Sequence, residues 1–318
     1  MSERLGLYKK LMLELNRAVL QKRTDEHELH QLFWECTLRC NLNCRHCGSD
    51  CRMLSEKDDM PFADFAKVLD EIREHQDPGK LMVITTGGEP TVRPDLAQCG
   101  AEISKRGFVW GMVCNGMLLS AEKLNEFMDA GLKSLAVSFD GFEEDHNWMR
   151  GNPNSYKNVL RAVEAMKQHP SLTWDVITCV NQRTIKYLPQ FRDFLISLGI
   201  RRWRLFTVFP FGRAANEPDF KLSNEQFVMM MEFIRQTRLE GKSVPTMAAT
   251  ASSVSMKARC ATTISRVAQA STWLRCWPTA PFQAASASAV TTTRAISIRT
   301  ASGTCGKTSS RSTATTHG

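Results

Sequence analysis

Residues 81–90 read Leu-Met-Val-Ile-Thr-Thr-Gly-Gly-Glu-Pro, an apolar run that ends in a glycine-rich turn. A run without polar alternation is typical of a strand that is buried on both faces of a parallel sheet. Similar segments recur and alternate with helical patterns, which predicts an α/β fold. We favour a partial (β/α)6 TIM-type barrel over a doubly wound open sheet. The expected strands are 31–38, 81–86, 108–114, 134–139, 173–180 and 202–208.

Helical periodicity and capping residues place the expected helices between these strands. Residues 3–22 form an amphipathic pattern, for which packing on the body of the protein is favoured over a membrane anchor. Ser120 is a candidate N-cap, and Ser223 with Gln226 forms a capping box for a helix from 224 to about 239. Further patterns lie near 62–72, 156–168 and 186–198.

Charge divides the 318 residues unevenly. The formal net charge is +8, but residues 241–318 hold nine of the 41 basic residues and none of the 33 acidic ones. Residues 1–240 therefore carry 32 bases and 33 acids and are nearly neutral, which argues against nucleic-acid binding. We expect an N-terminal helical extension (1–29), a core domain (30–240) and a basic tail rich in Ala, Ser and Thr (241–318), which is expected to be disordered.

Cysteine usage indicates metal binding in a reducing compartment. Five of the 11 cysteines fall within residues 36–51, and no secretory signal or membrane-spanning run of about 18 apolar residues is evident. We therefore expect a cytoplasmic protein without a membrane span.

Three of these cysteines carry the strongest chemical signal. Cys40, Cys44 and Cys47 follow the first expected strand with the spacing CxxxCxxC. Three thiolates are one too few for a closed tetrahedral zinc site, but they can hold a [4Fe–4S] cluster with one iron left open. No second pair of zinc ligands is obvious. Cys36 is expected to point into the core, whereas Cys51 remains open as a fourth ligand.

Polar or glycine-rich loops follow most of the other expected strands, where an α/β barrel gathers its functional residues. The turn Gly87-Gly88-Glu89-Pro90 lets the backbone approach a ligand and offers a carboxylate to an ammonium group. The further candidates are Asn115, Ser138, Asp140, Asn181 and Arg150. Several have a plainer interpretation, because Asn-Gly and Asp-Gly pairs also form ordinary turns and Arg150 is equally suited to the surface.

The cysteine motif and the Gly-Gly-Glu-Pro turn together resemble the radical S-adenosylmethionine (SAM) superfamily. The resemblance covers about residues 30–240, and the phrases Leu42–Cys51 and Trp148–Pro153 are similar to bacterial enzymes of this superfamily that modify peptides or proteins. One branch of those enzymes belongs to lipoprotein systems, and members often carry a C-terminal SPASM or twitch extension for auxiliary clusters.

The resemblance implies a [4Fe–4S] cluster on the three cysteines and SAM bound at the open iron. Residues 87–90 would meet the methionine amine, Ser138 and Asp140 the ribose or carboxylate, and Asn181 the ribose. Arg150 would pair with a carboxylate, and His46 stands where the superfamily often has an aromatic residue near the adenine. One electron, from a donor such as flavodoxin or ferredoxin, would cleave SAM to a 5′-deoxyadenosyl radical that abstracts hydrogen from a peptide or protein. No residue is assigned as catalytic.

The alternatives are a non-catalytic iron–sulfur or zinc protein and an inactive truncated product. The composition of the tail supports an inactive truncated product, because more than half of residues 247–318 are Ala, Ser or Thr. One permitted decoding of another reading frame restores acidic residues, aromatic residues and three cysteines in a pattern similar to auxiliary-cluster domains. We therefore hypothesise a frameshift near residues 241–246, which resequencing of the gene would test.

Overall fold

A single curved sheet forms the centre of the protein. The computed structural model describes residues 6–26, 29–55, 58–241, 244–247, 273–276 and 283–284. The strand order is β7-β6-β5-β4-β3-β2-β1-β8-β9, and β1 to β6 pair in parallel with their neighbours in chain order. These six are β1 (Gln31–Thr37), β2 (Met82–Gly87), β3 (Val109–Cys114), β4 (Leu132–Ser138), β5 (Thr173–Val180) and β6 (Arg202–Thr207). All six lie within two residues of their predicted positions, which confirms the parallel α/β architecture.

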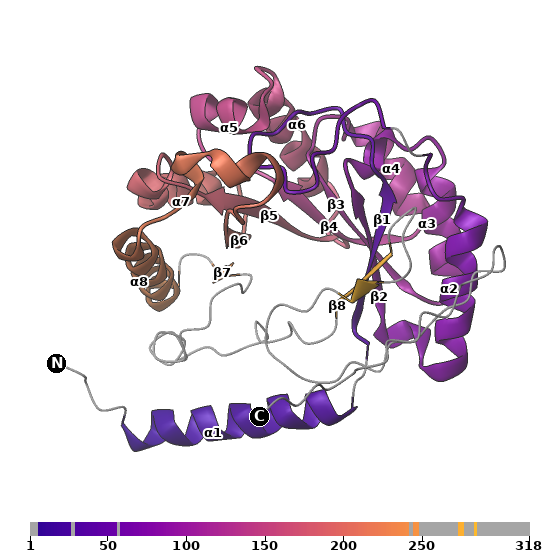
Figure 1. Ribbon diagram of the computed structural model, residues 1–318, viewed down its shortest axis with the longest axis horizontal. Coiled ribbons are helices and arrows are strands. Elements are labelled where there is room, and N and C mark those ends of the chain that lie inside the picture. The colour runs from indigo at the N-terminus through magenta and orange to yellow at the C-terminus, as the bar shows by residue number, and fades with distance from the viewer. Residues whose placement is uncertain are drawn as a thin grey trace, which may run out of the picture.

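The connecting helices cover the outer side of the curved sheet (Figure 1). The Ser120 hydroxyl accepts from the Lys123 amide at 3.2 Å, and the capping box of Ser223 and Gln226 is present, as predicted. Two helices, α3 and α5, were not expected from the sequence. The seven helices that follow β1 are α2 (Phe62–His75), α3 (Leu96–Lys105), α4 (Ala121–Asp129), α5 (Glu143–Arg150), α6 (Ser155–Lys167), α7 (Leu188–Ser197) and α8 (Asn224–Glu240).

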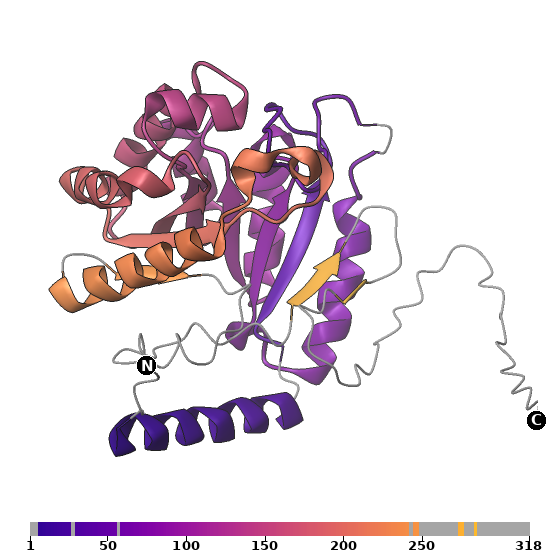
Figure 2. The ribbon, with the colours of Figure 1, turned by 60° about the vertical axis from the view of Figure 1, so that its left-hand side comes forward.

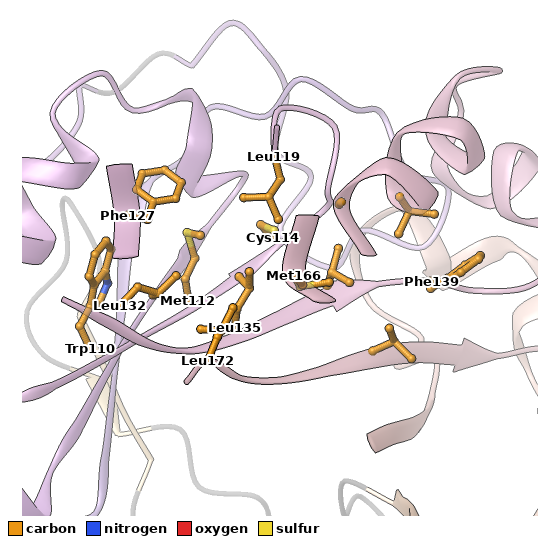
Figure 3. Packing of buried hydrophobic residues seen from close by; sticks show 14 of the residues in the cluster. Trp110, Met112, Cys114, Leu119, Phe127, Leu132, Leu135, Phe139, Met166 and Leu172 are labelled. Atoms are coloured by element: carbon orange, nitrogen blue, oxygen red, sulfur yellow. The ribbon is translucent and has the colours of Figure 1, made fainter. Parts of the chain in front are cut away.

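The core lies between the sheet and these helices and contains three buried tryptophans on strands, Trp34, Trp110 and Trp203. Trp110 of β3 meets Phe127 of α4 edge-on, with ring centroids 6.0 Å apart (Figure 3). Its indole N–H donates to the Thr85 hydroxyl of β2 at 3.2 Å. Trp203 of β6 likewise donates to Thr178 of β5 at 2.8 Å. Trp110 and Trp203 thus satisfy their indole N–H groups on the neighbouring strand, whereas the buried indole nitrogen of Trp34 on β1 has no hydrogen-bond partner.

The N-terminal helix α1 (Leu7–Glu26) corrects one expectation. Most of its apolar pattern faces solvent: Leu7, Tyr8, Leu11, Leu15 and Val19 are 42–85% exposed, whereas Met12 and Leu13 are half-buried. Figures 1 and 2 both show the helix apart from the layer of helices on the sheet. Within the described residues, no helix is both long enough and apolar enough to cross a membrane.

Three short strands lie in the described part of the chain after residue 240, and the expectation of a disordered or frameshifted tail stays a prediction. The strands are β7 (Val244–Met247), β8 (Trp273–Cys276) and β9 (Gln283–Ala284). The strand β7 pairs in parallel with β6, β8 pairs in parallel with β1, and β9 is antiparallel to β8. The backbone groups at the open edges of β1 and β6 accept such additions. The rest of residues 241–318, including most of the segment that the frameshift hypothesis concerns, lies outside the described residues.

Candidate metal and cofactor site

The segment between β1 and α2 carries the three cysteines and meets three other loops and the helix α5 at the carboxyl edge of the sheet. We call residues 38–52 the cysteine loop. Glu89 after β2 donates its amide to the Arg39 carbonyl at 2.9 Å, and Asn115 after β3 donates its side-chain amide to Asn41 at 2.8 Å. The Arg45 amide bonds to the Met149 carbonyl of α5 at 2.9 Å. The loop after β6 completes the contacts, and Figure 2 shows it beside the cysteine loop.

Within this loop the three predicted ligands are free thiols. Cys40 and Cys44 are each 8% exposed and form one buried group with Cys51, against which Cys47 packs. A turn closes Cys44 on Cys47, whose amide donates to the Cys44 carbonyl at 3.2 Å. Burial raises the pKa of Cys40 to about 12, whereas the hydrogen bond from Cys51 holds the pKa of Cys47 below its usual range. Cys36 is fully buried, as predicted.

The donor set fits a cluster better than one metal ion. Among the described residues, no group of three or more His, Cys, Asp or Glu side chains is placed to hold a single ion. A [4Fe–4S] cluster takes each thiolate on a different iron, so its ligands need not converge on one point. The nearby cation also fits, because Arg150 directs its Nη1 at the Cys44 sulfur from 3.8 Å.

Arg150 and Asp140 form a buried ion pair beside this sulfur. The Nε and Nη2 atoms of Arg150 each lie 2.6 Å from Asp140 Oδ2, and Oδ1 accepts the Cys179 amide at 2.9 Å. Asp140 is fully buried and Arg150 is 7% exposed. Burial acts to raise the pKa of Asp140, but the Arg150 guanidinium and the other neighbouring groups, including the Cys179 amide, together hold the pKa below its usual value. The protein itself therefore supplies a carboxylate partner for the arginine.

The Gly-Gly-Glu-Pro turn lies against the start of the cysteine loop. A Cβ atom on Gly88 would lie 2.2 Å from the Arg39 carbonyl oxygen, and one on Gly87 would lie 2.2 Å from that of Thr37. The close approach that requires the glycines is therefore to the protein's own backbone. Pro90 is buried and begins a 3-10 turn, η2 (Pro90–Val92).

Glu89 points inward from this turn and is only 1% exposed. Its Oε1 accepts from the Thr91 amide at 3.2 Å and from the Thr91 hydroxyl at 2.6 Å, while Oε2 accepts the Asn115 amide at 2.7 Å. Burial raises the pKa of this carboxyl group. Unlike Asp140, it forms no salt bridge with any residue that the structure describes, so an incoming ammonium group would stabilise its charged form.

Three other predicted residues, Asn181, Asn115 and Ser138, have different positions and contacts. Asn181 is 1% exposed, and its side-chain oxygen accepts the amides of Arg183 and Thr184 at 2.9 and 3.2 Å, which is the plainer turn role. Asn115 joins the β3 loop to the cysteine loop. Ser138 ends β4 and is half-buried.

His46 carries a polar atom without a partner. Its Nδ1 is buried and has no hydrogen bond, and the ring meets Phe220 edge-on at 6.0 Å. Burial, followed by the charge of Arg150, lowers the pKa of His46 to about 3, so the ring is neutral. An orphaned ring nitrogen beside Cys47 suits a site that receives a polar ligand.

Gly212 and Arg213 complete the site, although the sequence assigned them no role. They begin the 3-10 turn η4 (Gly212–Asn216), and the Arg213 Nε donates to the Cys44 carbonyl at 2.7 Å. The available signal was their place after the sixth expected strand. Their partners lie more than 160 residues earlier in the chain, beyond the reach of a local pattern.

Comparisons with known proteins agree with this geometry. Residues 34–195, about half of the chain, match the model of the radical SAM superfamily. The chain belongs to this superfamily, whose enzymes use a [4Fe–4S] cluster and SAM.

Individual relatives differ in what they act on. The chain is 27% identical over 210 residues to an AdoMet-dependent heme synthase of Methanosarcina barkeri, covering 66% of this chain and 58% of that protein. It is 29% identical over 181 residues to the PqqA peptide cyclase of Bradyrhizobium diazoefficiens, covering 57% and 47%. The chain thus spans about half the length of these relatives.

A solved structure supports the fold. Streptococcus suis SuiB, determined with bound SAM, superposes with a TM-score of 0.62 over 88% of this chain and 66% of SuiB, at 12% identity. This likeness confirms the partial barrel predicted from the sequence.

Proposed function

We propose that this chain reductively cleaves SAM to a 5′-deoxyadenosyl radical and modifies a peptide or protein. The observation that carries the proposal is the group of three free thiols on one loop at the carboxyl edge of the sheet, in a chain of this superfamily. A peptide substrate is supported by the relationship to the PqqA peptide cyclase and by the phrases around Cys44 and Arg150. The immediate electron donor would be a small protein such as flavodoxin or ferredoxin.

In this proposal each part of the site has a distinct task. Cys40, Cys44 and Cys47 hold the cluster through their thiolates. When bound, the cluster supplies the electron that cleaves SAM. Arg150 places a positive charge at the Cys44 sulfur, which stabilises an anionic ligand set.

The neighbouring loops would hold SAM itself. The Glu89 carboxylate would take the ammonium group, and Gly87, Gly88 and Pro90 keep that carboxylate beside the cysteine loop. The neutral His46 ring would line the adenine side. The remaining candidate contacts to SAM are Asn115, Ser138, Asp140, Arg150 and Asn181.

A tetrapyrrole is the second candidate substrate. It rests on the relationship to the heme synthase of Methanosarcina barkeri, which is 27% identical over 210 residues. The two candidates make different predictions: a peptide substrate should be modified in an assay where an iron porphyrin stays unchanged, and a tetrapyrrole enzyme should show the reverse.

The core proposal is tested without a substrate. After anaerobic reconstitution with iron and sulfide, the full chain should bind about four irons and show the broad visible absorbance of an iron–sulfur cluster. With reductant and SAM it should release 5′-deoxyadenosine, which mass spectrometry detects. The variant with Cys40, Cys44 and Cys47 all changed to Ala should lose both signals, whereas Cys114→Ala serves as a buried-thiol control.

Other outcomes favour the alternatives. A colourless protein that binds zinc in place of iron would indicate a zinc-binding role. A stable cluster that never yields 5′-deoxyadenosine would indicate a passive iron–sulfur protein or an inactive product.

A further inference from the structure

The loop after β6 grips the part of the cysteine loop that carries two predicted ligands. Besides its 2.7 Å bond to the Cys44 carbonyl, Arg213 donates its backbone amide to the Cys47 carbonyl at 3.0 Å. Its Nη1 donates to the Cys51 carbonyl at 3.3 Å and also pairs with Asp50. One residue therefore binds the carbonyl groups of Cys44, Cys47 and Cys51.

Gly212 lets this contact form. Its φ of +60° lies in the left-handed region, which disfavours side chains. A Cβ atom there would lie 2.5 Å from both the Cys47 and Gly48 carbonyl oxygens. Any larger residue would push the two loops apart where the third ligand is attached.

The opposite side of the cysteine loop is held by α5, through the Arg45 amide and the Met149 carbonyl. The loop thus lies between two elements, and only α5 falls within residues 34–195 that match the superfamily model. Gly212 and Arg213 on the β6 side lie after the matched residues.

On the basis of the proposed function, we infer that Gly212 and Arg213 are positioning residues for the cluster. They keep Cys44 and Cys47 in the turn that presents both thiolates, and Arg213 adds a positive charge beside the anionic site. Removal of residues that orient metal ligands typically weakens metal binding by 10–100-fold.

The first test measures cluster retention in reconstituted full-length protein. Arg213→Ala should lose iron to an excess of a ferrous chelator roughly 10-fold faster than the unmodified protein. Arg204→Ala is the matched control, because Arg204 lies on β6 and pairs with Asp175 away from the cysteine loop. Iron loss from Arg213→Ala at the rate of this control would overturn the inference.

The reduction potential separates charge from hydrogen bonding. Arg213→Ala should shift the midpoint potential to a more negative value, because the added electron loses a nearby positive charge. Arg213→Lys keeps the charge but lacks the guanidinium fork, so it should restore the potential while iron loss remains fast. A potential unchanged in Arg213→Ala would remove the electrostatic part of the inference.

The second test needs no cluster. In the apo protein, amide hydrogen exchange of residues 40–52 should be faster in Arg213→Ala than in Arg204→Ala, with the strands β3 and β4 unchanged. Gly212→Ala should act in the same direction. Its control is Gly199→Ala, because Gly199 has a similar φ of +80° but open space, with its nearest atom at 3.8 Å.

The failure of this inference is distinct from failure of the proposed function. If the unmodified protein binds no cluster, the proposed function fails and the exchange experiment still decides the role of Arg213. If the unmodified protein binds a cluster and cleaves SAM, but Arg213→Ala matches the control in iron loss and in exchange, only the positioning role is refuted.

Discussion

Glu89 and Asp140 are two buried carboxylates at the same edge of the sheet, and their surroundings make them opposite in character. Burial acts to raise the pKa of Asp140, but its bond to the guanidinium of Arg150 and its other neighbours together hold the pKa below the usual value. Glu89 accepts only neutral donors from Thr91 and Asn115, and burial raises its pKa. Similar burial therefore gives opposite pKa shifts, depending on whether a cation is bonded directly to the carboxylate.

The difference distinguishes a charged pair that stabilises the protein from a carboxylate that is available to bind a cationic ligand. The pair of Asp140 and Arg150 is complete without a ligand and stabilises the wall behind Cys44. Glu89 has desolvated oxygens that a cation would stabilise, and it lies on the turn that contacts the cysteine loop. This contrast supports Glu89 over Asp140 as the group that would receive the SAM ammonium.

The largest effect is expected when the complete pair is broken. Asp140→Asn leaves the buried Arg150 charge without a charged partner and places an amide N–H₂ against either the guanidinium or the Cys179 N–H, which should cost about 3–5 kcal/mol in the free energy of unfolding. Urea denaturation measures this cost. Asp70→Asn is the control, because Asp70 is 53% exposed and its pairing with Arg106 should contribute less than about 1 kcal/mol. Similar costs for both variants would refute the assignment of a buried pair.

A smaller effect is expected at Glu89. In Glu89→Gln the oxygen can keep its bonds to Thr91, but the new N–H₂ group faces the Asn115 amide, and two donors cannot bond. The unsatisfied amide should cost about 1–3 kcal/mol by urea denaturation. In the reconstituted protein the same variant should weaken SAM binding, whereas a variant that binds SAM normally would remove Glu89 from the proposed ammonium site.

Dependence on pH should distinguish the two carboxylates by sign. The folded state raises the pKa of Glu89 above its ordinary 4.5, so its contribution to stability is largest below that pH and falls as the pH rises through the raised value. The advantage of the unmodified protein over Glu89→Gln should therefore shrink as the pH rises above 4.5. The pKa of Asp140 is lowered from 3.8, so the advantage over Asp140→Asn should persist at higher pH and shrink only on acidification below 3.8.

Urea denaturation from pH 3 to 8 measures both differences. Parallel curves for the two variants would contradict the opposite shifts and with them the contrast between the two carboxylates.

The sequence predicted much of this arrangement because its signals are local. Continuous apolar runs such as Leu81–Ile84 located the six strands, and a parallel sheet brings their carboxyl ends to one edge. The cysteine spacing then placed the three thiols there. The partners of individual side chains were not predictable: the pairing of Arg150 with Asp140 depends on α5, an eight-residue polar helix without a strong apolar pattern.

Two other outcomes depended on tertiary contacts. The sequence predicts that Gly87 and Gly88 leave space for a ligand. In the structure the Thr37 and Arg39 carbonyl oxygens occupy the space beside these two glycines. The apolar pattern of α1 predicted packing, but periodicity does not identify the surface that a helix faces. Similarly, nothing near Arg213 in the sequence indicates a bond to Cys44.

The smallest effect is expected at Thr91, whose hydroxyl is one of three donors to Glu89. Thr91→Val keeps the shape of the side chain but removes the 2.6 Å bond, which should cost about 1 kcal/mol and raise the pKa of Glu89 further. Thr91→Ser keeps the hydroxyl and removes one methyl group, so it separates hydrogen bonding from packing. If only Thr91→Val moves the pH dependence attributed to Glu89, the hydroxyl helps to set its charge state. If both variants lose equal stability and leave that pH dependence unchanged, Thr91 acts through packing alone, and the receptive character of Glu89 depends on burial and the Asn115 amide.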